Sequence, residues 1–200
     1  PIDFVIISHN HHDHLDLATL RKLSKRDPDT VFFVPLGNGE LLRKNGIDQV
    51  QELDWGETAS FKDATIHCLP TQHWSKRSLT DTRKALWSSW AVTGPQRRFY
   101  FAGDTGYPAV FPLFWQIGDA LGPFDLAAIP IGAYAPAWFM ADSHVNPSEA
   151  LAIHEQVLAA HGGGNGIRSM ALVESAVAAP RATMSGHLLI SEPVEIAAAY

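Results

Sequence analysis

The amino-acid sequence predicts an α/β fold, and three observations carry that prediction. Short apolar runs suited to buried strands alternate with segments of helical periodicity along most of the chain. The first five predicted elements follow in the order strand, helix, strand, helix, strand, which is typical of parallel sheets with crossover helices. Polar and ligand-type residues come directly after several predicted strands, where open α/β sheets place their functional sites.

The first strand and the first helix flank a polar loop. Phe4–Ile7 is a continuous apolar run, which predicts a strand buried on both faces. The loop His9–His14 follows its carboxyl end. Asp16 can cap a helix that runs to about Ser24, because its carboxylate can accept backbone N–H groups of the first turn. The inner face of this helix is formed by Leu17, Leu20 and Leu23.

The next elements complete a βαβαβ order. Val31–Val34 predicts a second buried strand, and Glu40–Lys44 predicts a short helix that an Asn-Gly pair ends. Gln49–Leu53 predicts the third strand. We therefore expect a parallel sheet with its helices on the connections.

A second group of strands is predicted to follow. Within Phe61–Leu69 a Lys-Asp turn leads into a strand. Ala85–Val92 and Arg98–Phe101 predict an antiparallel hairpin around a Thr-Gly-Pro-Gln turn. The second strand of the hairpin runs into a glycine-rich turn, which places Asp104 at another strand end.

Further helices and strands are predicted in the rest of the chain, and the hydrophobic periodicity weakens towards its end. Helices are expected at 111–118 and 149–160, and strands at 125–131, 170–173 and 188–190. The second of these helices follows Pro147, and its inner face is formed by Ala150, Ile153 and Val157.

Composition limits the kind of protein that this chain can be. With 200 residues, 46% of them hydrophobic, the sequence suits a single domain, residues 1–200, with a sizeable core. The net charge of -6 and the lack of a basic stripe argue against nucleic acid as a partner. Cys68 is the sole cysteine, so neither an intrachain disulfide nor a thiolate zinc site is available.

The sequence shows few signals of cellular location. No signal peptide is visible in residues 1–200, and no apolar run there is long enough to span a membrane. We therefore expect a cytoplasmic protein, or one that lies at a membrane face. The chain begins at Pro1 and enters a strand almost at once, so further sequence is expected upstream. The oligomeric state leaves no signal in the sequence.

The loop after the first strand contains four metal-ligand side chains within six residues, namely His9, His11, Asp13 and His14. Alternation along an extended or turning backbone sends the first three to one side, and His14 follows round the turn. Imidazole nitrogen with carboxylate oxygen suits Zn²⁺ or, failing that, iron, manganese or cobalt. A solvated polar loop is the alternative. His12 points away from its neighbours and is predicted not to be a ligand.

Several motifs together resemble those of the metallo-β-lactamase superfamily. They are Ser8-His9-Asn10-His11-His12-Asp13-His14-Leu15-Asp16, Gln72-His73-Trp74, Leu86-Trp87 with Trp90, Phe99–Tyr107, and Trp138-Phe139-Met140 followed by His144-Val145. Within the superfamily, the chain is similar to the phospholipases D that hydrolyse N-acylphosphatidylethanolamine and to their bacterial relatives. The resemblance covers residues 1–160, and residues 161–200 form a diverged tail.

This resemblance implies a fold and a set of metal ligands. The fold is an αββα four-layer sandwich of the metallo-β-lactamase type, here expected without its N-terminal strands and with an atypical C-terminal tail. One zinc ion would be held by His9, His11 and His73, a second by Asp13 and His14, and Asp104 would bridge them. Without the resemblance, an isolated histidine such as His73 is more often a surface residue, and Asp104 an ordinary turn aspartate.

The implied activity is zinc-dependent hydrolysis, with one or two metal ions. Metal-bound hydroxide would attack a phosphodiester of a phospholipid-like substrate, with Asp13 orienting the nucleophile and Asp104 bridging the ions. His144 would contact the phosphate or give a proton to the leaving group, or it is simply a histidine at a helix entry. Lactone or other ester hydrolysis on the same metals is an alternative, as is a degenerate metal-binding domain without turnover.

Three further positions are candidates for binding a small-molecule or lipid substrate. Arg77 can pair with a phosphate or can belong to a solvated loop. Tyr134 is a candidate for lining the pocket. Trp138 begins an apolar triplet, expected in a loop, that can receive an acyl chain, touch a membrane face peripherally or pack in the core.

The chain departs from the family pattern at the last metal ligand. That ligand is a histidine in a Gly-x-His-Trp-Gly motif, and Gly166–Met170 stands in its place. Arg168 cannot replace the histidine because its guanidinium group stays protonated. We therefore expect the second metal to be weakly held or absent.

Overall fold

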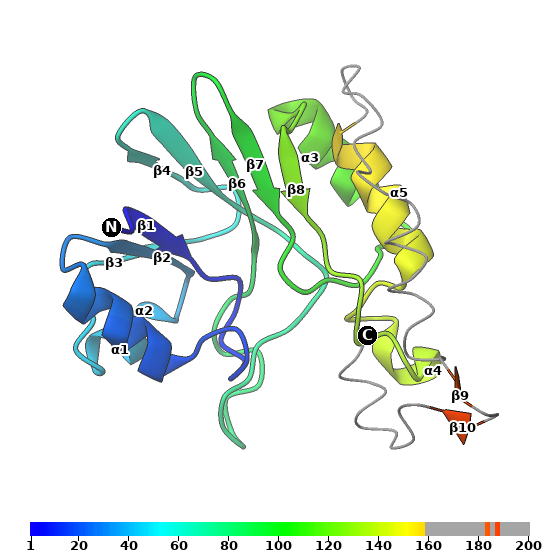
Figure 1. Ribbon diagram of the computed structural model, residues 1–200, viewed down its shortest axis with the longest axis horizontal. Coiled ribbons are helices and arrows are strands. Elements are labelled where there is room, and N and C mark those ends of the chain that lie inside the picture. Colours follow the sequence, from blue (N-terminus) through cyan, green and yellow to red (C-terminus); the bar gives the residue numbers. More distant parts are fainter. Residues whose placement is uncertain (159–182, 185–186, 189–200) are drawn as a thin grey trace. The chain divides into compact units, whose positions relative to one another are not determined.

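Residues 1–158, 183–184 and 187–188 are described by the computed structural model of the protein (Figure 1). By the contacts between its residues the chain divides into two units, Pro1–Asp104 and Thr105–Tyr200, and each is described by itself. Whether residues 1–200 act as one domain stays a prediction.

The first unit begins with a parallel sheet and two crossover helices. Its strands are β1 (Phe4–Ile6), β2 (Val31–Pro35) and β3 (Val50–Leu53), which pair in parallel in the order β1-β2-β3. The connections contain α1 (Leu17–Arg26) and α2 (Gly39–Arg43), which lie on one face of this sheet (Figure 1). The predicted βαβαβ order is therefore confirmed.

The helix α1 begins where the sequence predicts. The carboxylate of Asp16 accepts hydrogen bonds from the backbone N–H of Ala18 (3.3 Å) and Thr19 (2.9 Å). The helix ends two residues after the predicted end at Ser24. Its apolar side packs on the sheet in a core cluster made of Ile7, Leu15, Leu20, Phe32, Val34, Leu42 and Ile47.

The edge strand β1 differs from its prediction in burial. All three of its residues are only half-buried, whereas a strand buried on both faces was expected. Within the described residues β1 pairs with β2 alone, so it forms an edge of its sheet and is covered less than β2.

The second sheet of this unit is antiparallel. It contains β4 (Thr58–Phe61), β5 (Ala64–Leu69), β6 (Ser89–Thr93) and β7 (Arg98–Phe101), each paired with the next. The predicted hairpin is confirmed, although β6 begins at Ser89 rather than at Ala85. Strand β4 was not predicted.

The two sheets of the first unit face each other across a second core cluster. Phe33 and Leu53 come from the parallel sheet, and Ala59, Ile66, Cys68 and Trp90 come from the antiparallel sheet. Helices, parallel sheet and antiparallel sheet thus form three successive layers within residues 1–104 (Figure 1).

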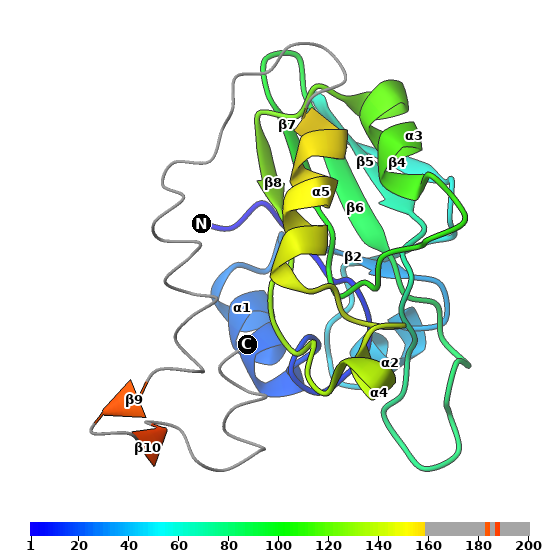
Figure 2. The ribbon, with the colours of Figure 1, turned by 90° about the vertical axis from the view of Figure 1, so that its right-hand side faces the viewer.

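The second unit contains α3 (Leu113–Leu121), β8 (Leu126–Ala128), α4 (Ala137–Met140) and α5 (Pro147–Leu158). Helices α3 and α5 lie side by side (Figure 2). Their close contact requires a glycine, because a Cβ atom on Gly118 would lie 2.4 Å from the carbonyl oxygen of Gln156. The predicted inner face of α5 is confirmed, since Ala150, Ile153 and Val157 are all buried.

Two predictions for the second unit are wrong in part. Strand β8 is shorter than the expected 125–131, and it is not buried, since Leu126 is 63% exposed. The triplet Trp138-Phe139-Met140 lies in the short helix α4 rather than in a loop. In the described part of the chain, none of the helices has the length and apolar character needed to cross a membrane.

Some predictions fall on residues outside the described ranges. These are the strand at 170–173, the end of the helix at 160 and the position of Arg168. In the tail, β9 (Thr183–Met184) pairs antiparallel with β10 (His187–Leu188), which shares one residue with the strand expected at 188–190.

Candidate metal centre

The histidine-rich loop is fixed at both ends. Before it, the backbone N–H of Ile7 donates to Phe33 O (3.0 Å), and Ile7 O accepts from Trp90 Nε1 (2.9 Å). After it, His11 O accepts from the backbone N–H of His14 (3.1 Å) and Leu15 (2.9 Å), which forms a tight turn into α1. The loop is therefore held between the end of β1 and the start of α1.

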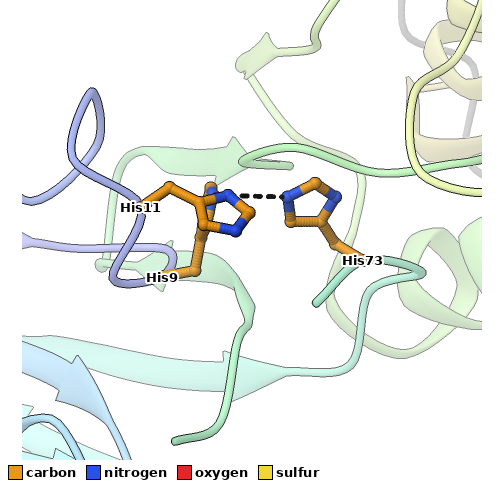
Figure 3. A group of neighbouring side chains, drawn as sticks. All are labelled: His9, His11 and His73. Atoms are coloured by element: carbon orange, nitrogen blue, oxygen red, sulfur yellow. Dashed lines mark hydrogen bonds between the residues drawn. The ribbon is translucent and has the colours of Figure 1, made fainter. Parts of the chain in front are cut away.

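Three histidines from two loops turn ring nitrogens towards one another. His9 Nε2 lies 2.8 Å from His11 Nδ1, and His73 Nε2 lies 3.4 Å from the same atom. His73 comes from the loop after β5, and Figure 3 shows its ring facing that of His11. His9 and His73 are buried and His11 is half-buried. Their three nitrogen atoms form a group that could hold a metal ion.

A second group shares His9 and adds a carboxylate. Asp104, from the turn after β7, places Oδ2 3.1 Å from His14 Nε2 and 3.9 Å from His9 Nε2. The same oxygen lies 3.8 Å from His73 Nε2. His9, His14 and Asp104 thus form another possible ligand group, and Asp104 Oδ2 faces imidazoles of both groups.

The ionisation of these side chains follows from their burial and mutual contacts. Burial, together with the neighbouring His73 and His14, lowers the pKa of His9 to about 2, so its ring is neutral at pH 7. Burial opposes the charge of Asp104, but the hydrogen bond from His14 and the nearby imidazoles outweigh it and lower its pKa to about 2. Burial likewise opposes protonation of His14, but Asp104 outweighs it and raises the pKa of His14.

The donor set fits a divalent transition metal. On a tetrahedral ion with metal–nitrogen distances of about 2.0–2.1 Å, the ligand nitrogens lie roughly 3.3 Å apart. The 3.4 Å between His73 Nε2 and His11 Nδ1 is close to that value, and the 2.8 Å between His9 Nε2 and His11 Nδ1 is shorter. Neutral imidazoles and one ionised carboxylate are ligands that suit zinc, and also iron, manganese or cobalt.

Two other predicted residues lie beside this cluster. The Asp13 side chain is 79% exposed, with Oδ2 3.7 Å from His14 Nε2, and belongs to none of the possible ligand groups among the described residues. Arg77 donates through Nη1 to the carbonyl oxygens of Asn10 (3.1 Å) and Leu15 (2.8 Å), so its guanidinium braces the histidine loop. The roles predicted for Asp13 in metal binding and for Arg77 in phosphate binding stay predictions.

The remaining predicted site residues belong to the second unit. Trp138 is 86% exposed and Phe139 is 69% exposed, with ring centroids 5.7 Å apart on α4. Tyr134 precedes this helix and His144 follows it. The substrate-binding or catalytic roles of Tyr134, Trp138 and His144 stay predictions.

Two neighbours of the cluster were missed by reasoning from the sequence. Ser8 Oγ lies 2.9 Å from His9 Nδ1 and 3.4 Å from His14 Nδ1. The ring of Trp74 meets that of His11 edge-on, with centroids 4.6 Å apart. Both residues are adjacent in sequence to predicted ligands and belong to the motifs that carry the resemblance, and these are the signals that could have pointed to them. His12, predicted not to be a ligand, is in none of the possible ligand groups of the described part, and its Nε2 lies 3.3 Å from Arg77 O.

The chain is similar to proteins of known name over most of its length. Residues 1–161 match the family described as the beta-lactamase superfamily domain. The chain is 48% identical over 167 residues to N-acyl-phosphatidylethanolamine-hydrolyzing phospholipase D 1 of Caenorhabditis elegans, a match covering 79% of this chain and 46% of that protein. With the mitochondrial N-acyl-phosphatidylethanolamine-hydrolyzing phospholipase D of Saccharomyces cerevisiae it shares 42% identity over 157 residues, covering 76% of this chain and 33% of that protein.

A solved structure has a similar fold. CmlA, a diiron beta-hydroxylase from Streptomyces venezuelae, matches with a TM-score of 0.56 and 23% identity, covering 80% of this chain and 34% of that one. The chain spans less than half the length of each of these proteins.

Proposed function

The chain belongs to the beta-lactamase superfamily domain family, and we propose that it is a metal-dependent hydrolase that cleaves a phosphodiester of a phospholipid-like substrate. The family membership confirms the resemblance found in the sequence and the metallo-β-lactamase type of fold. The observation that carries the proposal is the convergence of His9, His11, His73, His14 and Asp104 on one small volume. The substrate class is proposed from the names of the two relatives.

We propose zinc as the metal, with one or two ions per chain. When bound, such an ion would activate a water molecule at neutral pH and attract the oxygens of a phosphoryl group. His9, His11 and His73 would hold the first ion, and His14, Asp13 and Asp104 the second, with Asp104 as a ligand of both. The low pKa values of His9 and Asp104 support this assignment, because neither side chain needs to lose a proton at pH 7 before it can bind a cation.

The other predicted residues keep their roles as parts of the proposal. Asp13 would orient the attacking water, and His144 would contact the phosphate or protonate the leaving oxygen. Tyr134 and Trp138 would contact the lipid, and the exposed apolar rings on α4 support a contact with acyl chains or a membrane face. Arg77 would contact the phosphate with guanidinium nitrogens other than Nη1, which bonds the loop. A location in the cytoplasm or at a membrane face is consistent with these contacts.

The test is hydrolysis by the purified full chain loaded with zinc. We expect N-acylphosphatidylethanolamine in detergent micelles to be cleaved by water into phosphatidic acid and an N-acylethanolamine, both detected by mass spectrometry. A panel of lactones is assayed in parallel. Activity on lactones alone would contradict the phosphodiester proposal and leave a metal-dependent ester hydrolase.

A matched pair of variants separates metal chemistry from loop structure. His11→Ala removes a member of the first ligand group, whereas His12→Ala removes the next histidine of the same loop, which is in neither described group. We expect the first variant to lose activity and bound metal and the second to keep both. If zinc-saturated protein binds less than one ion and hydrolyses neither substrate class, the chain is a degenerate domain without turnover.

A further inference from the structure

Ser8 lies beside the Nδ1 atoms of His9 and His14. The Nε2 atoms of the same two rings face the carboxylate of Asp104. Its Oγ is 2.9 Å from His9 Nδ1 and 3.4 Å from His14 Nδ1. On the opposite edges of the rings, His9 Nε2 and His14 Nε2 lie 3.9 and 3.1 Å from Asp104 Oδ2. One hydroxyl group therefore lies within hydrogen-bonding distance of two candidate ligands.

The tautomer of an imidazole decides which nitrogen can bind a metal. A neutral ring has one N–H and one lone pair, and only the nitrogen with the lone pair is a ligand. For Nε2 of His9 and His14 to bind a cation, each Nδ1 must carry the hydrogen and needs an acceptor. A serine hydroxyl oxygen has two lone pairs, which is enough for two such hydrogen bonds.

We propose that Ser8 is a positioning residue that preorganises both rings, because its Oγ accepts hydrogen bonds from Nδ1–H of His9 and of His14. It thereby leaves Nε2 of both rings, on the edge that faces Asp104, as the nitrogen that can bind the cation. This inference rests on the metal-binding role proposed above, and it assigns a residue outside the ligand set. Groups that orient metal-binding histidines in this way commonly change metal affinity by roughly 10–100-fold when removed.

The position of Ser8 is fixed by its surroundings. Ser8 O accepts hydrogen bonds from the backbone N–H of Ser88 (2.8 Å) and from Ser88 Oγ (3.4 Å). A Cβ atom on Gly103 would lie 2.6 Å from Ser8 Cβ and 3.1 Å from Ser8 Oγ, so only glycine leaves room for the hydroxyl. Ser8 is 3% exposed, and solvent cannot easily replace its oxygen as the acceptor.

The third neighbouring ring is arranged differently. His11 turns Nδ1 towards His9 and His73, so as a ligand it would carry its hydrogen on Nε2. No hydrogen bond joins it to Ser8 among those described. The proposed effect of Ser8 is therefore specific to His9 and His14, the two histidines of the group that contains Asp104.

The first test measures the tautomer of His9 in the metal-free full chain. We expect ¹⁵N NMR of histidine-labelled protein at pH 7 to place the hydrogen on Nδ1, with Ser8→Ala shifting the population towards Nε2–H. The His9 signals are assigned by their loss in His9→Gln. A wild-type His9 with its hydrogen on Nε2 would overturn the proposal, whether or not the chain binds metal.

The second test measures zinc affinity by competition with a chromophoric chelator. We expect Ser8→Ala to bind zinc roughly 10–100-fold more weakly and Ser8→Cys, whose sulfur is a weaker acceptor, to be intermediate. Ser89→Ala is the control, since it removes a buried hydroxyl that bonds Pro70 O (3.1 Å), and it should bind zinc like the wild type. Wild-type affinity in Ser8→Ala would overturn the proposal. Absence of zinc binding by the wild type would instead refute the proposed function, and the tautomer measurement would still decide the role of Ser8.

Discussion

Gly103→Ala probes the close approach between the end of β7 and the loop after β1. Gly103 has φ +61°, and an added Cβ would lie 2.6 Å from Ser8 Cβ and 3.2 Å from Ser88 O. The left-handed backbone costs an alanine about 1–2 kcal/mol. Forcing a methyl group into a filled site costs about 1–3 kcal/mol more. We therefore expect a loss of about 2–5 kcal/mol, which lowers Tm by roughly 4–20 °C in a chain of this size.

The assay is thermal and urea unfolding followed by circular dichroism, with metal removed by a chelator because bound metal would add its own stabilisation. Gly56→Ala is the matched control, since Gly56 has φ +86° and no neighbouring atom within 4 Å of the added Cβ. Gly56→Ala therefore has the same left-handed backbone strain as Gly103→Ala but creates no steric clash. Equal destabilisation by the two substitutions would refute the close approach of Gly103 to Ser8.

Three further outcomes are expected. Asp104→Asn should weaken metal binding by roughly 10-fold or more and abolish hydrolysis, because it removes the negative charge that faces the imidazoles of His9, His14 and His73. Unchanged metal content and an unchanged hydrolysis rate would refute the bridging role of Asp104. Glu52→Gln should destabilise the fold by about 1–2 kcal/mol at pH 7 in urea unfolding. Burial opposes the charge of Glu52, but hydrogen bonds from Gly39 N, Arg43 and Gly37 N lower its pKa below that of a free carboxyl group. The difference should therefore shrink as the pH falls through the pKa of a free carboxyl group and vanish below the lowered pKa of Glu52; a loss that does not change with falling pH would contradict this. Burial raises the pKa of Cys68 to about 12, so its thiol should react with Ellman's reagent only after unfolding, and rapid reaction of the native protein would disprove its burial.

The parallel half of the first unit was predictable because its signals are local. An apolar run marks β2, and the Asp16 carboxylate marks the start of α1. Strand β4 was not predictable in the same way. Of its four residues only Ala59 is buried, and its pairing with β5 depends on the hairpin as a whole.

Longer-range contacts explain the other differences. Ala85–Ser88 has strand-like composition, but its backbone pairs elsewhere, with Leu86 N donating to Leu36 O (2.8 Å) and Ser88 N to Ser8 O (2.8 Å). Leu126 is apolar and yet 63% exposed, so composition alone overstated the burial of β8. Such pairings join residues far apart in sequence and leave no periodic pattern to detect.

For the candidate site, too, the residues could be predicted from the sequence but their geometry could not. Residue type and position after a strand selected His9, His11 and His14, the family resemblance added His73 and Asp104, and the structure brings these five together. Which nitrogen of each ring faces inward was beyond the sequence, because it depends on rotamers and on Ser8. The exposure of Asp13 and the bracing of the loop by Arg77 also required the three-dimensional arrangement.

The most direct test of the metal centre is an anomalous diffraction map from crystals of the zinc-loaded chain. The proposal predicts a zinc peak about 2.0–2.1 Å from His9 Nε2, His11 Nδ1 and His73 Nε2. A peak held by other side chains, or none at saturating zinc, would contradict the assignment of these residues as the metal site.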